Sequence, residues 1–211
     1  MKILAVSDVV LDRLYTPEVK KVFPNVDLIL GCGDLPYEYL EFLVSSFNVP
    51  LLYVPGNHDP KFDPHNPSAR AEGCENIDGR VVRVKGLTIA GLGGGSRYQP
   101  HRPNQYTQEQ MYWRVGQLFL PLLWHRLLSG RAPDIIIAHS PPYGIHDDDD
   151  LAHQGFKAFL SLIRFFQPRY FLHGHTLPIN QNLQTAIQWI GATQIININP
   201  YQFLEVTPYG R

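Results

Sequence analysis

Short apolar runs that end in polar, glycine-containing turns recur along the chain, and this pattern constrains the fold more than any other feature of the sequence. Each run is brief, rich in branched or aromatic residues and bounded by turn residues, as is typical of a buried β-strand. The predicted strands are residues 3–6, 28–30, 51–54, 87–90, 135–138 and 170–172. Residues 37–47 and 155–166 instead carry apolar side chains at three- and four-residue steps, which predicts two helices.

Strands that alternate with helices predict an α/β architecture whose sheet is covered on both faces. The C-terminal part differs, because its apolar runs predict strands with no helix between them and therefore an antiparallel addition. These runs are residues 186–189, 193–198 and 203–206. Residues 61–76 and 91–104 are rich in proline or glycine and predict surface loops. No repeat or linker divides the sequence, so we expect one domain over residues 1–211.

The composition is that of a soluble globular protein: 44% hydrophobic and 18% charged residues, with a formal net charge of −1. Cys32 and Cys74 are far apart and form no C-x-x-C pair, so we expect neither a disulfide framework nor a cysteine zinc site, and a cytoplasmic location. Balanced charge without a basic run argues against nucleic acid as a partner. We expect no membrane span, since no apolar segment reaches the roughly 18 residues that one requires.

Residues of metal-ligand type follow the ends of several predicted strands. They are Asp8, Asp34, Asn57, His58, His139, His173 and His175. One such residue alone could cap a turn or pack half-buried. Because the carboxyl ends of strands in an open α/β sheet converge on one crevice, we expect this set to gather there. Mixed carboxylate, carboxamide and imidazole donors suit manganese, iron or zinc better than calcium.

Five short motifs, in this order and at these intervals, resemble the calcineurin-like metallophosphoesterase superfamily. They are Ser7-Asp8, Gly33-Asp34, Gly56-Asn57-His58-Asp59, Ala138-His139 and Gly174-His175. The resemblance extends from residue 2 to about residue 178 and is most specific at the Gly-Asn-His-Asp element. It implies a four-layer αββα sandwich and a two-metal centre that hydrolyses phosphomonoesters or phosphodiesters.

The resemblance also implies roles for individual residues. Asp34 would bridge two metals, and Asp8 would belong to the first metal site. The second site would be completed by Asn57, His139 and His175. His58 would protonate the leaving oxygen, oriented by Asp59. Paired cations about 3.5–4 Å apart would hold the phosphate and lower the pKa of a bridging water.

Two positions depart from the family pattern. The opening D-x-H motif has Val10 at its third position, and the closing G-H-x-H motif has Leu177 at its last. Both missing imidazoles belong to the first metal, which keeps only two protein ligands, fewer than the three typical of a catalytic zinc. We therefore predict one tightly held divalent ion, with Mn²⁺ favoured and iron or Zn²⁺ as alternatives, and a second position that is weak or vacant. Possible substitute ligands are His173, Asp12 and His146, each of which has a solvated or supporting role as its alternative.

Two further features lie close to these motifs in the sequence. Four consecutive aspartates at residues 147–150 predict a solvated acidic loop in which Asp149 or Asp150 caps the following helix, or else a rim that repels polyanions or holds an extra cation. In the glycine- and proline-rich loop, Arg97, His101 and Arg102 are either solvated or in contact with a substrate phosphate.

Two functions are compatible with this pattern. The first is a metal-dependent phosphoesterase, with phosphodiesterase activity favoured, whose substrate is a small-molecule phosphate ester or nucleotide. The second is a catalytically degenerate binding or scaffold protein, as in retromer's metallophosphoesterase-fold subunit. Retention of His58 favours the enzyme, because a scaffold has no use for a proton donor above a metal.

Overall fold

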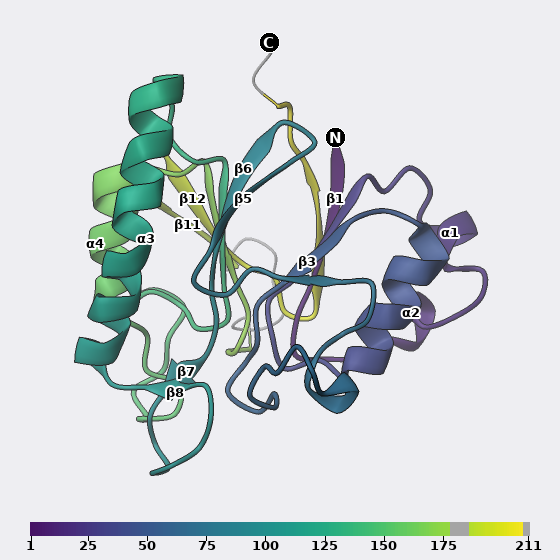
Figure 1. Ribbon diagram of the computed structural model, residues 1–211, viewed down its shortest axis with the longest axis horizontal. Coiled ribbons are helices and arrows are strands. Elements are labelled where there is room, and N and C mark those ends of the chain that lie inside the picture. Colours follow the sequence, from purple (N-terminus) through teal and green to yellow (C-terminus); the bar gives the residue numbers. More distant parts are fainter. Residues whose placement is uncertain (178–185, 209–211) are drawn as a thin grey trace.

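Two β-sheets form the centre of the computed structural model, which describes residues 1–177 and 186–208 (Figure 1). The first sheet has the strand order β13-β1-β2-β3-β4 and the second the order β11-β12-β10-β9-β6-β5. The strands of the first sheet are β1 (Lys2–Val6), β2 (Leu28–Gly31), β3 (Leu51–Tyr53), β4 (Glu75–Asn76) and β13 (Tyr201–Glu205). Those of the second are β5 (Val81–Val84), β6 (Leu87–Leu92), β9 (Ile135–Ala138), β10 (Tyr170–His173), β11 (Ile187–Ile190) and β12 (Thr193–Asn197).

Helices cover the outer face of each sheet, which gives the four layers that the family resemblance implies (Figure 1). Helices α1 (Val19–Val22) and α2 (Tyr37–Phe47) lie on the first sheet, and α3 (Gln108–Ser129) and α4 (Lys157–Phe166) lie on the second. Short 3₁₀ turns occur at Asp12–Leu14 and Pro67–Ala69, and β7 (Gly95–Ser96) pairs with β8 (Gln105–Tyr106) just before α3.

Alternating side chains along the strands explain the three apolar layers. In β1, Ile3 and Ala5 point into the core between the two sheets, whereas Leu4 and Val6 pack beneath α2. Strand β9 alternates in the same way, with Ile135 facing the other sheet and Ile136 facing α3 and α4. The expected α/β architecture is confirmed, and each sheet is covered on both faces, by helices on one face and by the other sheet on its second face.

Most strands within each sheet are parallel, so their carboxyl ends lie along one edge of that sheet. Strands β1, β2 and β3 are mutually parallel, as are β6, β9, β10 and β12. The predicted antiparallel addition is confirmed for β11, which pairs antiparallel with β12, and for β13, which pairs antiparallel with β1. The segments that follow β1, β2, β3, β9 and β10 all leave from carboxyl ends of parallel strands, and these segments carry the predicted ligands.

Three local predictions need correction. Helix α3 and strand β5 were not expected from the sequence. Residues 91–96 were expected in a surface loop, but all six are buried, in part as the end of β6. The second predicted helix begins at Lys157 instead of residue 155, and the amide of Lys157 donates to the side chain of Gln108 in α3 (3.0 Å).

Candidate metal centre

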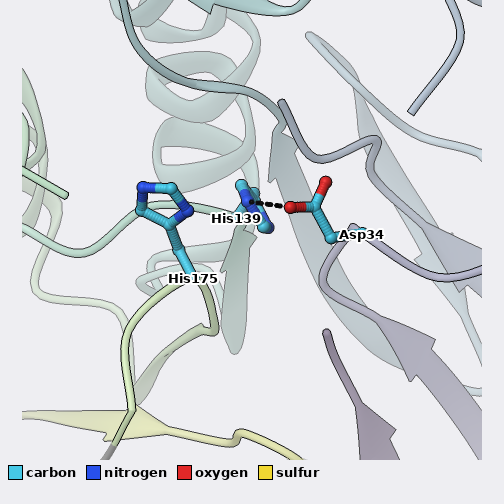
Figure 2. Close-up of side chains that lie close together, drawn as sticks. All are labelled: Asp34, His139 and His175. Carbon is cyan, nitrogen blue, oxygen red and sulfur yellow. Dashed lines mark ion pairs between the residues drawn. The ribbon is translucent and has the colours of Figure 1, made fainter. Parts of the chain in front are cut away.

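Three side chains from different strand ends converge between the two sheets (Figure 2). Asp34 follows β2, His139 follows β9 and His175 follows β10, and each offers a ligand atom within 4.8 Å of the other two. The Asp34 Oδ2 atom lies 3.3 Å from Nε2 of His139, and the rings of His139 and His175 have centroids 4.7 Å apart. Strands of both sheets therefore contribute to one cluster.

Oxygen atoms converge on one nitrogen of His139. Its Nδ1 lies 2.8 Å from the carbonyl of Cys32, which can only accept, so this nitrogen carries a hydrogen. The opposite nitrogen, Nε2, faces Asn57 Oδ1 at 2.9 Å as well as Asp34 Oδ2. A neutral imidazole would point a lone pair at two oxygens there, in a site where His139 is fully buried. A proton on Nε2 would satisfy both oxygens, and a metal ion beside it would bind the same three atoms.

His175 presents one ring nitrogen to this cluster because its other nitrogen is occupied. Nε2 lies 2.8 Å from the carbonyl of Ala152, so it carries the hydrogen and leaves Nδ1 as the donor atom. Figure 2 shows one nitrogen of the His175 ring turned toward His139 and the other turned away. Asp8 fixes the backbone, since its Oδ2 accepts the amide hydrogen of His175 (2.9 Å). Thus one carboxylate oxygen of Asp8 holds the loop that carries His175 in place.

The backbone at these positions is held in an uncommon conformation. Asp8, Asp34 and His175 all have left-handed φ values, of 64°, 54° and 69°. Such conformations are uncommon for residues other than glycine, although asparagine, aspartate and histidine adopt them more often than most, and they are enriched at functional sites. Close packing adds a second restriction, since a Cβ atom on Gly174 would collide with Ser7 Oγ and Asp8 Oδ2. The turns after β1 and β10 therefore fit together only with glycine at this position.

Electrostatics favour a cation between these groups. Burial opposes ionisation of Asp34, but the facing His139 and hydrogen bonds to the carboxylate lower the pKa of Asp34 to about 2. Burial likewise opposes protonation of His139, yet Asp34 raises the pKa of His139 to about 9. Burial and the neighbouring His139 lower the pKa of His175 to about 3, so this ring is neutral. A carboxylate and a neutral imidazole are the ionisation states that bind metal.

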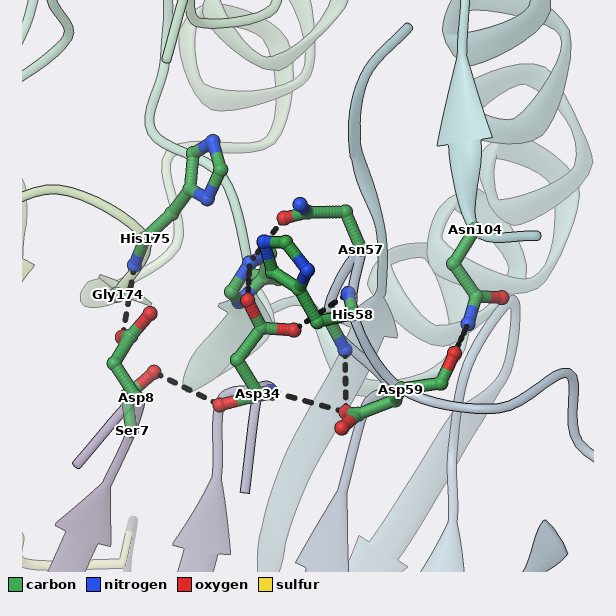
Figure 3. A network of polar contacts seen from close by, with 12 residues as sticks. Ser7, Asp8, Asp34, Asn57, His58, Asp59, Asn104, Gly174 and His175 are labelled. Atoms are coloured by element: carbon green, nitrogen blue, oxygen red, sulfur yellow. Dashed lines mark hydrogen bonds and ion pairs between the residues drawn. The ribbon is translucent and has the colours of Figure 1, made fainter. Parts of the chain in front are cut away.

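His58 and Asp59 lie at the rim of the cluster (Figure 3). The amide of His58 donates to Asp34 Oδ1 (2.9 Å), and the His58 side chain lies between two surface cavities of about 500 and 150 Å³. We expected Asp59 to orient the His58 ring, but its Oδ2 accepts from the amides of Gly56 (2.7 Å) and Asp34 (3.0 Å). Within residues 1–177 and 186–208, no hydrogen bond joins Asp59 to that ring. Asp59 instead connects the loops that follow β2 and β3.

The glycine-rich stretch at residues 91–96 supports the loop that carries Asn57. The amide of Gly94 donates to the carbonyl of Pro55 (2.8 Å), and a Cβ atom on Gly95 would lie 3.0 Å from Asn57 Oδ1. Asp78 fixes the stretch from the other side, because it accepts from the amide of Gly93 (2.6 Å). These glycines let two backbones approach, a role that the sequence alone did not indicate.

The remaining candidates lie outside the three-residue cluster. His173 is fully buried, with Nδ1 3.0 Å from the carbonyl of Gly174 and Nε2 2.9 Å from Nδ1 of His146. In the acidic loop, Asp150 accepts from the amides of Ala152 and His153 and contacts the His153 ring (2.7 Å). Asp148, Asp150 and His153 form a second, exposed group of metal-ligand type. No aspartate of this loop caps α4, whose N-cap residue is Phe156.

The arginines of the glycine- and proline-rich loop differ in their surroundings. Arg97 donates to Gln110 (2.9 Å) and to the carbonyl of Gln105 (3.1 Å), so it fastens the loop to the start of α3. Arg102 lines the smaller cavity beside His58, together with Tyr98 and Asn57. Of these two arginines, Arg102 is therefore the one placed where it can meet a ligand of the cluster.

A comparison with protein families agrees with this geometry. The model of the calcineurin-like phosphoesterase family matches residues 1–178, a range that spans all the strand ends described above. The chain belongs to this family. Members of the calcineurin-like phosphoesterase family use divalent metals, and the buried cluster here supplies candidate ligands.

Individual proteins are also similar to this chain. The uncharacterized protein MJ1162 of Methanocaldococcus jannaschii is 27% identical over 217 residues, which cover 96% of this chain and 90% of that protein. An uncharacterized protein of Haemophilus influenzae is 31% identical over 155 residues, covering 62% of this chain and 66% of that protein. The crystal structure of TT1561 of Thermus thermophilus has a TM-score of 0.60 at 20% identity and covers 93% of this chain and 88% of that one, a likeness in fold.

The two departures from the family pattern have different surroundings. Val10 is partly buried and packs against the apolar layer beneath α2, whereas Leu177 is 75% exposed. Neither position supplies a donor atom, and among the described residues the buried group of three metal-ligand side chains is limited to Asp34, His139 and His175. In addition, none of the described helices is long and apolar enough to cross a membrane.

Proposed function

We propose that this protein is a metal-dependent phosphoesterase that acts on a small phosphate ester, with phosphodiesters favoured, and that it binds one divalent ion tightly. The observation that carries the proposal is the convergence of Asp34 Oδ2 and Asn57 Oδ1 on the buried Nε2 of His139. His175 completes a set of two nitrogens and two oxygens from four loops. Such mixed donors suit Mn²⁺, iron or Zn²⁺.

A divalent ion held there would supply Lewis-acid polarisation of a phosphoryl oxygen and an acidified water at neutral pH. The protein supplies the surroundings for this chemistry. The carbonyls of Cys32 and Ala152 fix which nitrogen of His139 and of His175 faces the site. Fixed donors need no reorganisation as charge develops during the reaction.

His58 is the proposed general acid. Its amide is anchored to Asp34, while its side chain is exposed at the rim between the two cavities. An exposed imidazole can take a proton from solvent and pass it to the departing oxygen of an ester bound at the cluster. Arg102, on the wall of the smaller cavity, supplies a guanidinium group for the anionic part of that ester.

The test is hydrolysis of bis(p-nitrophenyl) phosphate and p-nitrophenyl phosphate by protein stripped of metal and then supplied with Mn²⁺, Fe²⁺ or Zn²⁺. We expect activity only with added metal, nearer one than two ions per chain, and near-complete loss on Asp34→Asn. A matched control is Asp149→Asn, which makes the same change at an exposed aspartate outside both ligand groups. Activity that Asp34→Asn leaves intact would exclude this site.

A second pair of variants separates the enzyme from the scaffold alternative. His58→Gln should lower kcat by roughly 100-fold or more while metal binding is retained. His65→Gln, at an exposed histidine that lines neither cavity, should leave kcat unchanged. A protein that binds metal but hydrolyses neither ester, with or without His58, would favour a binding or scaffold role.

A further inference from the structure

Helix α3 exposes a second apolar face in addition to the one that it buries. Met111, Val115, Leu118 and Leu122 pack against the second sheet. On its solvent side lie five large apolar residues, each between 65% and 73% exposed: Trp113, Leu120, Trp124, Leu127 and Leu128. We call these five residues the α3 outer stripe. The other described residues therefore leave about two thirds or more of each of these side chains exposed, and α3 lies on the outside of the molecule (Figure 1).

The α3 outer stripe is a continuous surface. At 3.6 residues per turn, its members fall within an arc of about 100° and extend over about 22 Å of helix. A tryptophan can bury roughly 150–250 Å², so two exposed tryptophans and three exposed leucines amount to several hundred Å², the size at which an apolar patch marks an interaction site. Residues 115–125 also contain no aspartate, glutamate, lysine or arginine. A charged partner surface is therefore disfavoured.

The order of residues along α3 is self-complementary when the helix is paired with an antiparallel copy of itself. With a two-fold axis at Leu120, Trp124 of one copy lies opposite Gly116 of the other, and Trp113 lies opposite Leu127. Gly116 is unusual in the middle of a helix, and a Cβ atom there would meet nothing within 4 Å. The open space at Gly116 matches the bulk of the opposed Trp124.

Charges at the ends of the helix fit the same arrangement. Glu109 lies in the first turn of α3, and Arg126 lies in its last turn. Antiparallel pairing brings the acidic start of each helix toward the basic end of the other, and it aligns the two helix dipoles favourably. From this complementarity we propose that the α3 outer stripe binds a second copy of this chain, forming a two-fold symmetric dimer.

The proposed dimer leaves both candidate metal centres open. The α3 outer stripe lies on the outer helical layer, whereas Asp34, His139 and His175 lie at the strand ends between the sheets. The dimer proposal therefore does not depend on the proposed phosphoesterase function and can be tested without any substrate.

Sedimentation equilibrium of the full chain over a range of concentrations tests the proposal. We expect a monomer–dimer equilibrium for the wild type and a dissociation constant raised roughly 30-fold or more by Leu120→Lys, which places two charges on the axis. The control Leu151→Lys changes an exposed leucine outside the stripe and should leave the dimer intact. Gly116→Gln improves helix propensity but fills the space opposite Trp124, so it should weaken the dimer without lowering Tm.

Cross-linking tests the antiparallel register. Leu120→Cys should form a disulfide-linked dimer under mild oxidation, because a residue on a two-fold axis meets its own copy. Leu128→Cys should not, since the two copies of residue 128 lie about 24 Å apart along paired helices. A monomeric wild type, a dimer insensitive to Leu120→Lys, or equal cross-linking at both positions would overturn the proposal. So would a monomer that binds phosphatidylglycerol vesicles through this face, which would assign the stripe to a membrane surface.

Discussion

Replacement of Asp59 by asparagine and by alanine tests whether this residue holds the metal-site loops together or serves His58. Asp59 is only 8% exposed, and its Oδ2 accepts from the amides of Gly56 and Asp34. Burial raises the pKa of Asp59 to about 6, so the charged carboxylate is itself disfavoured in the folded protein. Both variants remove that charge, but only Asp59→Asn keeps an oxygen at the same place.

The difference between the two variants therefore isolates the two hydrogen bonds. An amide left buried without a partner costs about 1–3 kcal/mol, so the loss of both bonds should make Asp59→Ala less stable than Asp59→Asn by about 2–6 kcal/mol. For a domain of this size, each kcal/mol corresponds to about 2–4 °C in Tm. Urea unfolding of both variants without added metal measures the difference directly. We also expect Asp59→Ala to bind Mn²⁺ more weakly, because the loop that carries Asn57 keeps the bond from the His58 amide to Asp34 but loses the one between Asp59 and the Asp34 amide.

Two results would refute this reasoning. Equal stability of the alanine and asparagine variants, within about 0.5 kcal/mol, would mean that the two amides find other partners. A stable Asp59→Asn protein that binds metal normally but has lost esterase activity would instead show that the carboxylate acts on His58, as the sequence suggested.

Three further predictions concern the metal site and its rim. Val10→His with Leu177→His should raise the metal content from near one toward two ions per chain, measured by plasma emission spectroscopy; an unchanged content would mean that the missing ligands are wrongly assigned. Gly174→Ala should lower stability by about 1–3 kcal/mol and weaken Mn²⁺ binding, because its Cβ would collide with side-chain atoms of the turn after β1, and a normal Tm would contradict this packing. Arg102→Ala should lower kcat/KM for the phosphodiester by about tenfold or more, mainly through KM, with Tm unchanged. Arg97→Ala should lower Tm instead, since Arg97 fastens the loop to α3, and the reverse pattern for the two arginines would refute their assignment.

Most of the strands could be predicted because their side chains are buried on both faces. In β9, Ile135, Ile136 and Ile137 are all fully buried, and such a run of branched residues between breakers has few other interpretations. The division into two sheets is not encoded in any single strand. It follows from which strands pair, and the sequence indicated it only through the family resemblance.

Helix α3 was missed for a physical reason. It has apolar residues on both its buried and its exposed side, so no single stripe appears, and Pro121 interrupts the pattern. A local signal was present, since Thr107 and Gln110 form a capping box at the N-terminus and Gly130 ends the helix in a left-handed conformation. A search for caps, rather than for periodicity, would have found it.

The sequence named the side chains that lie in the candidate cluster, whereas it did not indicate the groups that orient them. The carbonyls of Cys32 and Ala152 decide which nitrogens of His139 and His175 face the site. Backbone groups carry no signature in a sequence, because every residue has one. The role of Asp59 was likewise hidden, since a motif gives neighbours along the chain and not the partners of a carboxylate in space.

The proposed ligands lie on loops of both sheets: Asp34 and Asn57 belong to one, and His139 and His175 to the other. More than eighty positions of chain separate Asn57 from His139. Neither half of the chain supplies more than two of the four proposed ligands, so the proposed site is complete only after the sandwich has closed. Bound metal would then slow unfolding without speeding folding, so that the occupancy of the metal site would set the lifetime of the native state.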